Sequence, residues 1–156
     1  MKERIRKLDG HGNVSGRTIR LVVAALILRT VSGEDGKRTE VLVCQRRPDQ
    51  PMSLKWEFPG GKIEPGETAE QALARELDEE LGIVATIGRR VAQLRHRYRN
   101  GGSIDLQFFV VESFERELEN RIFNAMQWTP LDALPALDFL AADHTLIRDL
   151  ADGKLL

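Results

Sequence analysis

The sequence has a single cysteine, no long apolar run and no excess of either charge. With Cys44 as the only cysteine, an internal disulfide is excluded, and the apolar run around it favours a buried thiol over a catalytic one. The charged residues 1–6 are not followed by the apolar core of a secretory signal, and no segment has the length of a membrane span. These absences predict a cytoplasmic protein that does not associate with a membrane.

Basic and acidic residues nearly balance, at 23 and 24, for a formal net charge of -1. This balance gives no overall field for holding a nucleic-acid polymer, so the expected partner is a small molecule. A length of 156 residues with 42% hydrophobic residues is typical of one globular domain. We expect a flexible N-terminal extension at residues 1–18 and a single domain at residues 19–156, as a monomer or a homodimer.

The first half of the chain is predicted to begin with strands. Residues 20–28 and 40–45 are aliphatic, β-branched runs separated by the turn-rich residues 32–37, which predicts a hairpin. Residues 48–55 are expected to form a loop. Residues 57–62 are too rich in glycine and proline to continue any element.

A helix is predicted from Thr68 to about Leu81, because threonine caps helix starts and Gly82 suits a helix end. The pattern after it predicts strands, then a helical turn and a C-terminal helix; the ranges are 84–97, 103–114, 126–129, 131–134 and 141–151. The resulting fold class is α/β, with a mixed β-sheet between helices.

The predicted helix carries carboxylates on its inward face. The apolar stripe Ala69, Ala72 and Leu73 continues at helical spacing into Glu76 and Glu80, with Glu79 beside them. A Glu-rich helix face is usually only solvated. Here an inward position makes ionised groups costly unless they are paired, and Arg75 is the only basic residue in the helix. A divalent cation would balance this charge.

The ligands on offer are hard oxygens, which favour Mg²⁺, with Mn²⁺ as a substitute, over zinc. Such cations also bind phosphate oxygens. The pair Gly60-Gly61 allows a close backbone approach, and Lys62 adds a positive charge where a polyphosphate would lie.

These residues together resemble the Nudix box, without a departure. Seven fixed and two aliphatic positions match, which chance would produce on the order of once in a billion windows. The matching residues are Gly61, Glu67, Arg75, Glu76, Leu77, Glu79, Glu80, Gly82 and Ile83. Residues 45–47, 56–62 and 139–143 are similar to the MutT-type subgroup of nucleoside triphosphate pyrophosphohydrolases. The resemblance implies an α/β/α sandwich and hydrolysis of a triphosphate to monophosphate and pyrophosphate.

The resemblance also implies roles for the box residues. Glu76, Glu79 and Glu80 would bind the metal with the carbonyl of Gly61, and Arg75 would orient the carboxylates. Glu67 and Gly82 would be structural, and Lys62 and Arg47 would contact phosphate. The general base would be Glu76 or Glu79, or else a residue of the later loop, where Glu119 is available and Asn124 could not serve.

The nucleobase would contact Arg47, Phe58 and Asp143, although Phe58 fits core packing equally well. Asp143 departs from the asparagine of 8-oxoguanine-specific members, and an ionised carboxylate only accepts hydrogen bonds. An acceptor suits the N7-H of 8-oxoguanine or an exocyclic amine, as on cytosine or adenine. We therefore favour 8-oxo-dGTP narrowly over CTP or 5-methyl-dCTP. The alternatives are a dinucleotide or ADP-ribose substrate, and a catalytically silent nucleotide-binding domain.

Overall fold

The computed structural model describes Arg4, Ile5 and residues 18–156. The elements in chain order are β1 Arg4–Ile5, β2 Thr18–Leu26, β3 Leu28–Gly33, β4 Gly36–Gln45, β5 Trp56–Glu57, β6 Gly60–Lys62, α1 Ala69–Leu81, β7 Val84–Arg97, β8 Ser103–Glu115, β9 Ala125–Pro130, the 3-10 helices η2 Leu131–Ala136 and η3 Ala141–Asp143, and α2 His144–Ala151. The expected extension, residues 1–18, falls mostly outside the described residues, within which Arg4–Ile5 pairs with the start of β2.

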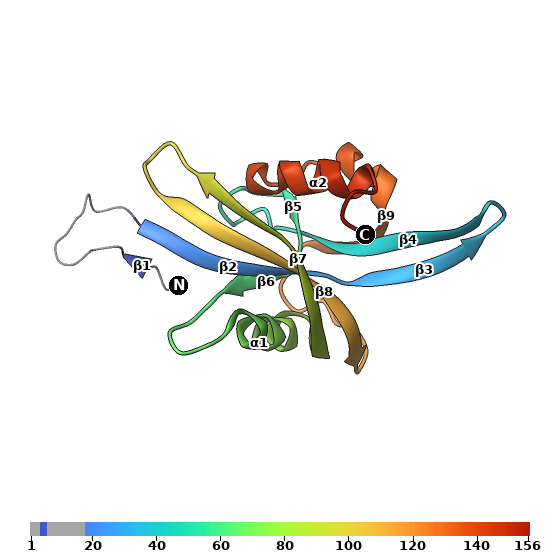
Figure 1. The fold of residues 1–156 in the computed structure, drawn as a ribbon, viewed down its shortest axis with the longest axis horizontal. Helices are drawn as coiled ribbons and strands as arrows, with labels where there is room; N and C mark the ends of the chain where they lie inside the picture. Colours follow the sequence, from blue (N-terminus) through green and yellow to red (C-terminus); the bar gives the residue numbers. More distant parts are fainter. Residues whose placement is uncertain (1–3, 6–17) are drawn as a thin grey trace.

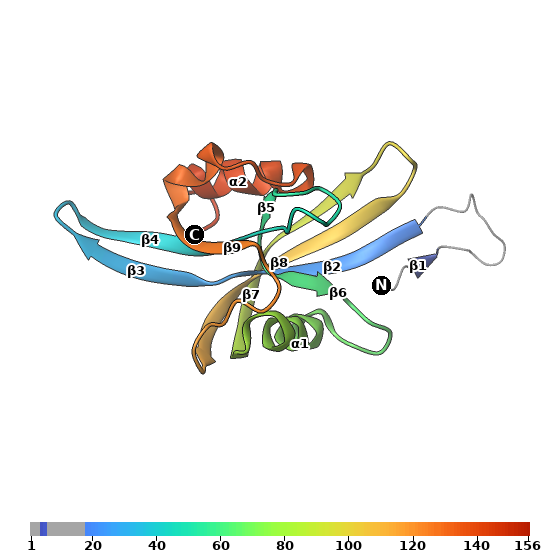
Figure 2. The same cartoon turned by 180° about the vertical axis from the view of Figure 1, so that it is seen from behind.

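The strands form two sheets, and the two α-helices lie on opposite sides of them (Figures 1 and 2). A five-stranded sheet has the order β1-β2-β8-β7, with β6 also paired to β2. It is mixed, because β2 and β8 run parallel while the other pairs are antiparallel. A four-stranded antiparallel sheet joins β3, β4, β5 and β9. This arrangement confirms the α/β fold class.

Strand β2 is buried on both faces, which explains its unbroken aliphatic run. Val23, Ala25 and Ile27 belong to a hydrophobic cluster with the inner face of α1. Ala24 and Leu26 belong to a second cluster, on the α2 side of the sheet, with Phe108, Phe139, Leu146 and Leu150. The five-stranded sheet therefore separates two cores.

The hairpin prediction was wrong about its first arm. Strand β4 pairs with β3, not with the aliphatic run of β2, which pairs with β8. The chain changes sheets at Ile27, whose carbonyl accepts a hydrogen bond from Leu42 at 3.0 Å. A run buried on both faces suits the central strand, while the mostly exposed residues of β3 suit an edge. Figure 1 shows the hairpin extending away from the helices.

Residues 57–62 also differ from the prediction. They complete β5 and form β6, because a short edge strand tolerates glycine that a long central strand would not, and Pro59 lies between the two strands. The later predictions are confirmed: α1, β7, β8 and β9 fall where the pattern put them, and the C-terminal helix is divided into η3 and α2. None of the described helices has the length and apolar character needed to span a membrane.

Candidate active site

Helix α1 is held in register at both ends. The Thr68 hydroxyl accepts a hydrogen bond from the Gln71 amide at 3.1 Å, and the Gln71 side chain accepts one from the Thr68 amide at 3.0 Å. At the other end Gly82 adopts a left-handed conformation with φ of 70° and donates to the carbonyl of Asp78. This conformation is costly for residues other than glycine. The two caps determine which way the box carboxylates point.

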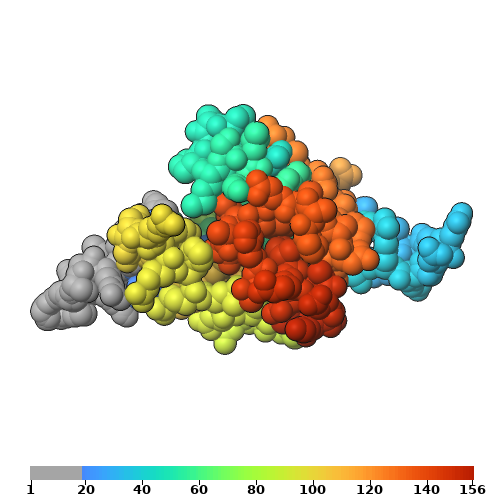
Figure 3. All heavy atoms as spheres, turned by 90° about the horizontal axis from the view of Figure 1, so that it is seen from above, coloured from blue at the N-terminus to red at the C-terminus, as the bar shows by residue number. Residues whose placement is uncertain are grey.

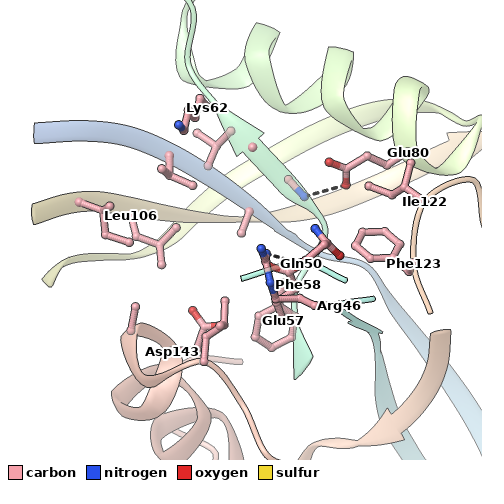
Figure 4. Close-up of a pocket in the computed structure, with 18 of the residues that line it drawn as sticks. Arg46, Gln50, Glu57, Phe58, Lys62, Glu80, Leu106, Ile122, Phe123 and Asp143 are labelled. Carbon is pink, nitrogen blue, oxygen red and sulfur yellow. Dashed lines mark hydrogen bonds and ion pairs between the residues drawn. The ribbon is translucent and has the colours of Figure 1, made fainter. Parts of the chain in front are cut away.

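Glu76 and Glu80 form a half-buried to buried carboxyl pair. The two side chains hydrogen-bond to each other, and the Gly60 amide donates to Glu80 at 3.2 Å (Figure 4). Burial raises the pKa of both carboxyl groups, and the negative charge of Glu76 raises that of Glu80 further. A Cβ atom at Gly61 would overlap the Glu76 carboxyl group. A larger residue at Gly61 would therefore displace the Glu76 carboxyl group from the backbone of β6.

Arg75 and Glu67 connect the loop before α1 to the carboxyl pair. Two nitrogens of Arg75 bind the two oxygens of Glu67, at 2.6 and 2.9 Å. Arg75 also donates to the carbonyl of Lys62 at 3.1 Å and to Glu76 at 3.2 Å. The bonds from Arg75 to Glu67, together with the amide of Glu64, lower the pKa of Glu67 to about 2. Glu67 thus remains charged and fixes Arg75, which in turn orients Glu76.

Glu79 differs from the other two box carboxylates. Its side chain is 60% exposed, and its nearest ionic contact is Arg75 at 3.5 Å. Among the described residues no three His, Cys, Asp or Glu side chains are gathered closely enough to hold a metal. Two of the three expected ligands are therefore assembled, and Glu79 would have to rotate to join them.

The oxygen atoms around Gly61 fit a hard divalent cation. The groups that meet at Gly61, Glu76 and Glu80 are carboxyl and backbone oxygens, the ligands that Mg²⁺ and Mn²⁺ prefer. The two carboxyl groups of this pair share a hydrogen bond. A divalent cation would replace the proton of such a pair.

A cavity of about 270 Å³ leads from the carboxyl pair toward the C-terminal segment. Its lining includes Gly60, Gly61, Lys62 and Glu80 at one end and Phe58, Tyr98, Leu140 and Asp143 at the other, with Val22, Ala24, Ile104 and Leu106 of the sheet between them. In Figure 3 the opening is flanked by the teal loop after β4, the yellow turn between β7 and β8, and the orange-red segment before α2. One pocket therefore joins Gly61 and Glu80 of the box to the expected base-binding residues.

Asp143 and Phe58 both line this pocket, as the sequence predicted. Burial raises the pKa of Asp143, which is only 3% exposed, to about 8, and the charge of Glu57 adds to the effect. At neutral pH the carboxyl is mainly protonated and can donate as well as accept, unlike the ionised group assumed from the sequence. Phe58 packs on Phe108 and Phe139, with ring centroids at 6.1 and 5.4 Å. It is both a core residue and a pocket wall.

Arg47 is the exception among the predicted pocket residues, since it does not line the cavity. Its guanidinium contacts Asp49 at 3.1 Å and the carbonyl of Ile122 at 2.9 Å, and the side chain is 45% exposed. Its neighbour Arg46 lines the pocket instead. The expectation of base and phosphate contacts at Arg47 is corrected accordingly: β4 ends at Gln45, and in the loop after it Asp49 and the carbonyl of Ile122 hold the Arg47 guanidinium outside the cavity.

The loop between β8 and β9, where a later general base was expected, brings no carboxylate to the pocket. Glu119 pairs with Arg121 at 2.8 Å beside the C-terminal end of α1, and Asn124 donates to Gln45 at 2.7 Å. The loop contributes Ile122 and Phe123 to the pocket lining. Its side of the pocket is therefore apolar.

Sequence reasoning missed several lining residues, among them Arg46, Gln50, Glu57, Tyr98 and Phe123. One feature of the sequence points to Arg46, which stands directly before Arg47 in an arginine pair. Tyr98 and Phe123 lie in turns far from the box, where no periodicity marks which side chains turn inward.

Comparisons with known proteins agree with this site. The family model described as the NUDIX domain matches residues 20–150. The CTP pyrophosphohydrolase of Escherichia coli is 43% identical over 114 residues, which cover 72% of this chain and 78% of that protein. The 8-oxo-dGTP diphosphatase of Escherichia coli is 38% identical over 114 residues, covering 73% and 88%. The solution structure of the E. coli ORF135 protein is 34% identical, with a TM-score of 0.73 and coverage of 88% and 91%.

The complete box on α1, the cavity beside it and these similarities lead to one assignment. The chain belongs to the Nudix hydrolase family, enzymes that act on diphosphate bonds.

Proposed function

We propose that the protein hydrolyses a nucleoside triphosphate to a monophosphate and pyrophosphate, and that 8-oxo-dGTP is its preferred substrate. One observation carries the proposal: a single cavity runs from Gly61 and Glu80 to Asp143. A nucleotide lying along it would have phosphates beside the box and its base beside Asp143. Lys62, on the wall near the box, would contact the phosphates.

The proposed cofactor is Mg²⁺, for which Mn²⁺ can substitute, held by Glu76, Glu79, Glu80 and the carbonyl of Gly61. A bound magnesium ion neutralises charge on phosphate oxygens and lowers the pKa of a water molecule. Arg75 keeps the Glu76 carboxylate in place during this chemistry, since it is itself fixed by Glu67. We propose a role in catalysis for Glu76, Glu79 and Arg75 on these grounds.

The general base is proposed to be Glu76 or Glu79 and not Glu119. A general base must come within hydrogen-bond reach of the attacking water, directly or through one further water. Glu119 is engaged with Arg121 and does not line the pocket, whereas Glu76 lies against Gly61 and Glu79, on the same helix, would reach the site by rotating its side chain.

The preference for 8-oxo-dGTP is supported by the protonated state of Asp143. A neutral carboxyl presents one donor and one acceptor side by side. The N7 edge of 8-oxoguanine offers an acceptor, O6, beside a donor, N7-H, while unmodified guanine offers two acceptors there. The carboxyl of Asp143 would therefore be fully paired by the oxidised base and only half paired by guanine.

CTP or 5-methyl-dCTP is the second candidate, because cytosine also places a donor, its amine, beside the acceptor N3. The E. coli relative named CTP pyrophosphohydrolase supports this possibility. We further propose that the enzyme acts in the cytoplasm, where the nucleotide pool lies, as a monomer or a homodimer.

The test is a comparison of kcat/KM with Mg²⁺ for 8-oxo-dGTP, dGTP, CTP, 5-methyl-dCTP and ADP-ribose. We expect 8-oxo-dGTP to exceed dGTP by at least tenfold, about the discrimination that one unpaired buried polar group gives. A flat profile would remove any role in sanitising the nucleotide pool. A profile led by a cytosine nucleotide would select the second candidate.

A further inference from the structure

A second cavity, of about 340 Å³, lies between η2 and α2. Its volume falls within the range of about 300 to 1,000 Å³ that is usual for ligand sites. Leu137 has an extended backbone, with φ of -95° and ψ of 150°, so the side chains of Leu137 and Phe139 turn to the same side. Together with Pro135 they form one wall of the cavity, and α2, red in Figure 3, forms the other.

Helical spacing explains which side chains of α2 face this second cavity. Ile147, Arg148 and Ala151 follow His144 by three, four and seven positions, so all four lie on one face of the helix. Ile147 and Ala151 extend the apolar wall, whereas Arg148 and His144 are exposed and border the opening. Asp152 lines the cavity one turn beyond Arg148. The second cavity thus combines apolar walls with an arginine at its edge.

Arg148 is the group at this cavity that can bind an anion. Its side chain forms no ion pair or hydrogen bond with another described residue, although Asp152 stands only four positions later. A guanidinium is always charged and presents its donors in a plane that matches a carboxylate. The nearby carboxylate of Asp152 disfavours a dianion such as a phosphate monoester. The second cavity therefore suits one carboxylate, placed between Arg148 and His144.

We propose that the second cavity binds a small organic carboxylate with an aromatic or branched aliphatic body, and that Arg148 is its anion-binding residue. The apolar body would lie against Leu137, Ile147 and Ala151, and the carboxylate would pair with Arg148. This site is separate from the first cavity, which joins Gly61 to Asp143, because no described residue lines both. The inference does not depend on the proposed function.

The wall between the two cavities is the segment from Phe139 to His144. The Phe139 ring packs on Phe58, with centroids 5.4 Å apart, and its carbonyl accepts a hydrogen bond from Nε2 of His144 at 3.0 Å. Phe58 and Asp143 line the first cavity. A ligand that contacts Phe139 and His144 therefore touches the segment that also carries the proposed base-binding carboxyl group.

The experiment titrates the protein with three probes that separate charge from apolar area: phenylacetate, its neutral amide phenylacetamide, and acetate. Changes in backbone amide chemical shifts, measured by NMR, give the affinity and locate the site. We expect phenylacetate to bind saturably with a Kd on the order of a millimolar. The largest shifts should fall in α2 and residues 135–139. Acetate and phenylacetamide should each bind at least about fivefold more weakly, because each lacks one of the two interactions.

R148Q and A151L test the two parts of the site separately. R148Q should weaken phenylacetate about fivefold or more and leave phenylacetamide within about twofold, since it removes only the charged contact. A151L fills the apolar part and should weaken both aromatic probes. The control is R95Q, which removes an arginine that lines neither cavity and should leave every affinity within about twofold. Thermal unfolding of each variant identifies a loss that comes from instability.

Four outcomes would overturn the inference. Shifts that do not saturate would mean that phenylacetate has no site, and shifts confined to the first cavity would place it there. Equal affinities for phenylacetate and phenylacetamide would leave a groove without selectivity for anions. Equal losses in R148Q and R95Q would assign the effect to net charge. None of these measurements needs turnover, so failure of the proposed triphosphate hydrolysis would leave this test intact.

Discussion

The two ends of the pocket are built in different ways. The end proposed to bind the metal comes from one helix and the short strand before it, so its carboxylates stand at fixed helical spacing. The base-binding end is assembled from four separate segments, which contribute Arg46, Phe58, Tyr98 and Asp143. Local geometry therefore places the groups proposed to carry the reaction, while the meeting of distant segments places those proposed to select the base.

Burial of carboxyl groups has a different consequence at each end. At the end proposed to bind the metal, Glu76 and Glu80 are adjacent, and burial raises the pKa of both carboxyl groups. At the proposed base-binding end, Glu57 is the charged group that acts on the pKa of Asp143, and burial keeps Asp143 neutral as a hydrogen-bonding acid. Burial thus raises carboxyl pKa values at both ends, in a pair at one end and in a single group at the other.

The largest expected effect comes from removing a carboxylate at the metal-binding end. We expect E76Q to lower kcat by about a hundredfold or more with saturating Mg²⁺, since both charge and metal affinity are lost. The control is E70Q, an exposed glutamate on the same helix, which should stay within twofold of the unmodified enzyme. Retention of more than a tenth of the turnover by E76Q would show that Glu76 is not needed for the reaction.

An intermediate effect is expected from D143N at the base-binding end. The folded protein holds the Asp143 proton up to about pH 8, whereas the unfolded chain releases it near the ordinary value of 3.8. Stability therefore falls as pH rises between these values, by on the order of a few kcal/mol, and is level above them. Asparagine cannot ionise, so D143N should gain stability relative to the unmodified protein across this range. Urea unfolding at pH 5, 7 and 9 measures this difference in stability.

Base preference should follow the same titration. Below pH 8 a neutral Asp143 and an asparagine both donate and accept, so D143N should keep the ratio of 8-oxo-dGTP to dGTP. Above pH 8 the ionised Asp143 loses its donor, and the two enzymes should diverge. A stability difference that is the same at every pH, or a ratio changed equally at pH 6 and pH 9, would contradict this account.

The smallest effect is expected from T68A at the start of α1. Loss of the capping hydroxyl should lower the free energy of unfolding by about 1 kcal/mol. The helix remains in place once folded, so the substrate ratios should not change, which separates the helix frame from base recognition. Thermal unfolding and the same substrate panel check both parts, and a changed base ratio would mean that the two ends are coupled.

The features predicted from sequence are those governed by neighbours along the chain. Thr68 and Gly82 bound α1 as expected, and the spacing of Glu76 and Glu80 brought both onto one face. The predictions that failed depended on partners far away in sequence. The aliphatic run 20–28 looked like a hairpin arm, yet β2 pairs with β8, more than seventy residues later.

The sequence by itself determined the family, the fold class and the set of carboxylates, because helix geometry turns spacing into position. Only the tertiary structure decided that Arg46 and not Arg47 lines the pocket, that Glu79 points outward, and that Asp143 is buried deeply enough to stay protonated. Each of these depends on how segments from different parts of the chain pack together, and burial sets both the charge and the reach of a side chain.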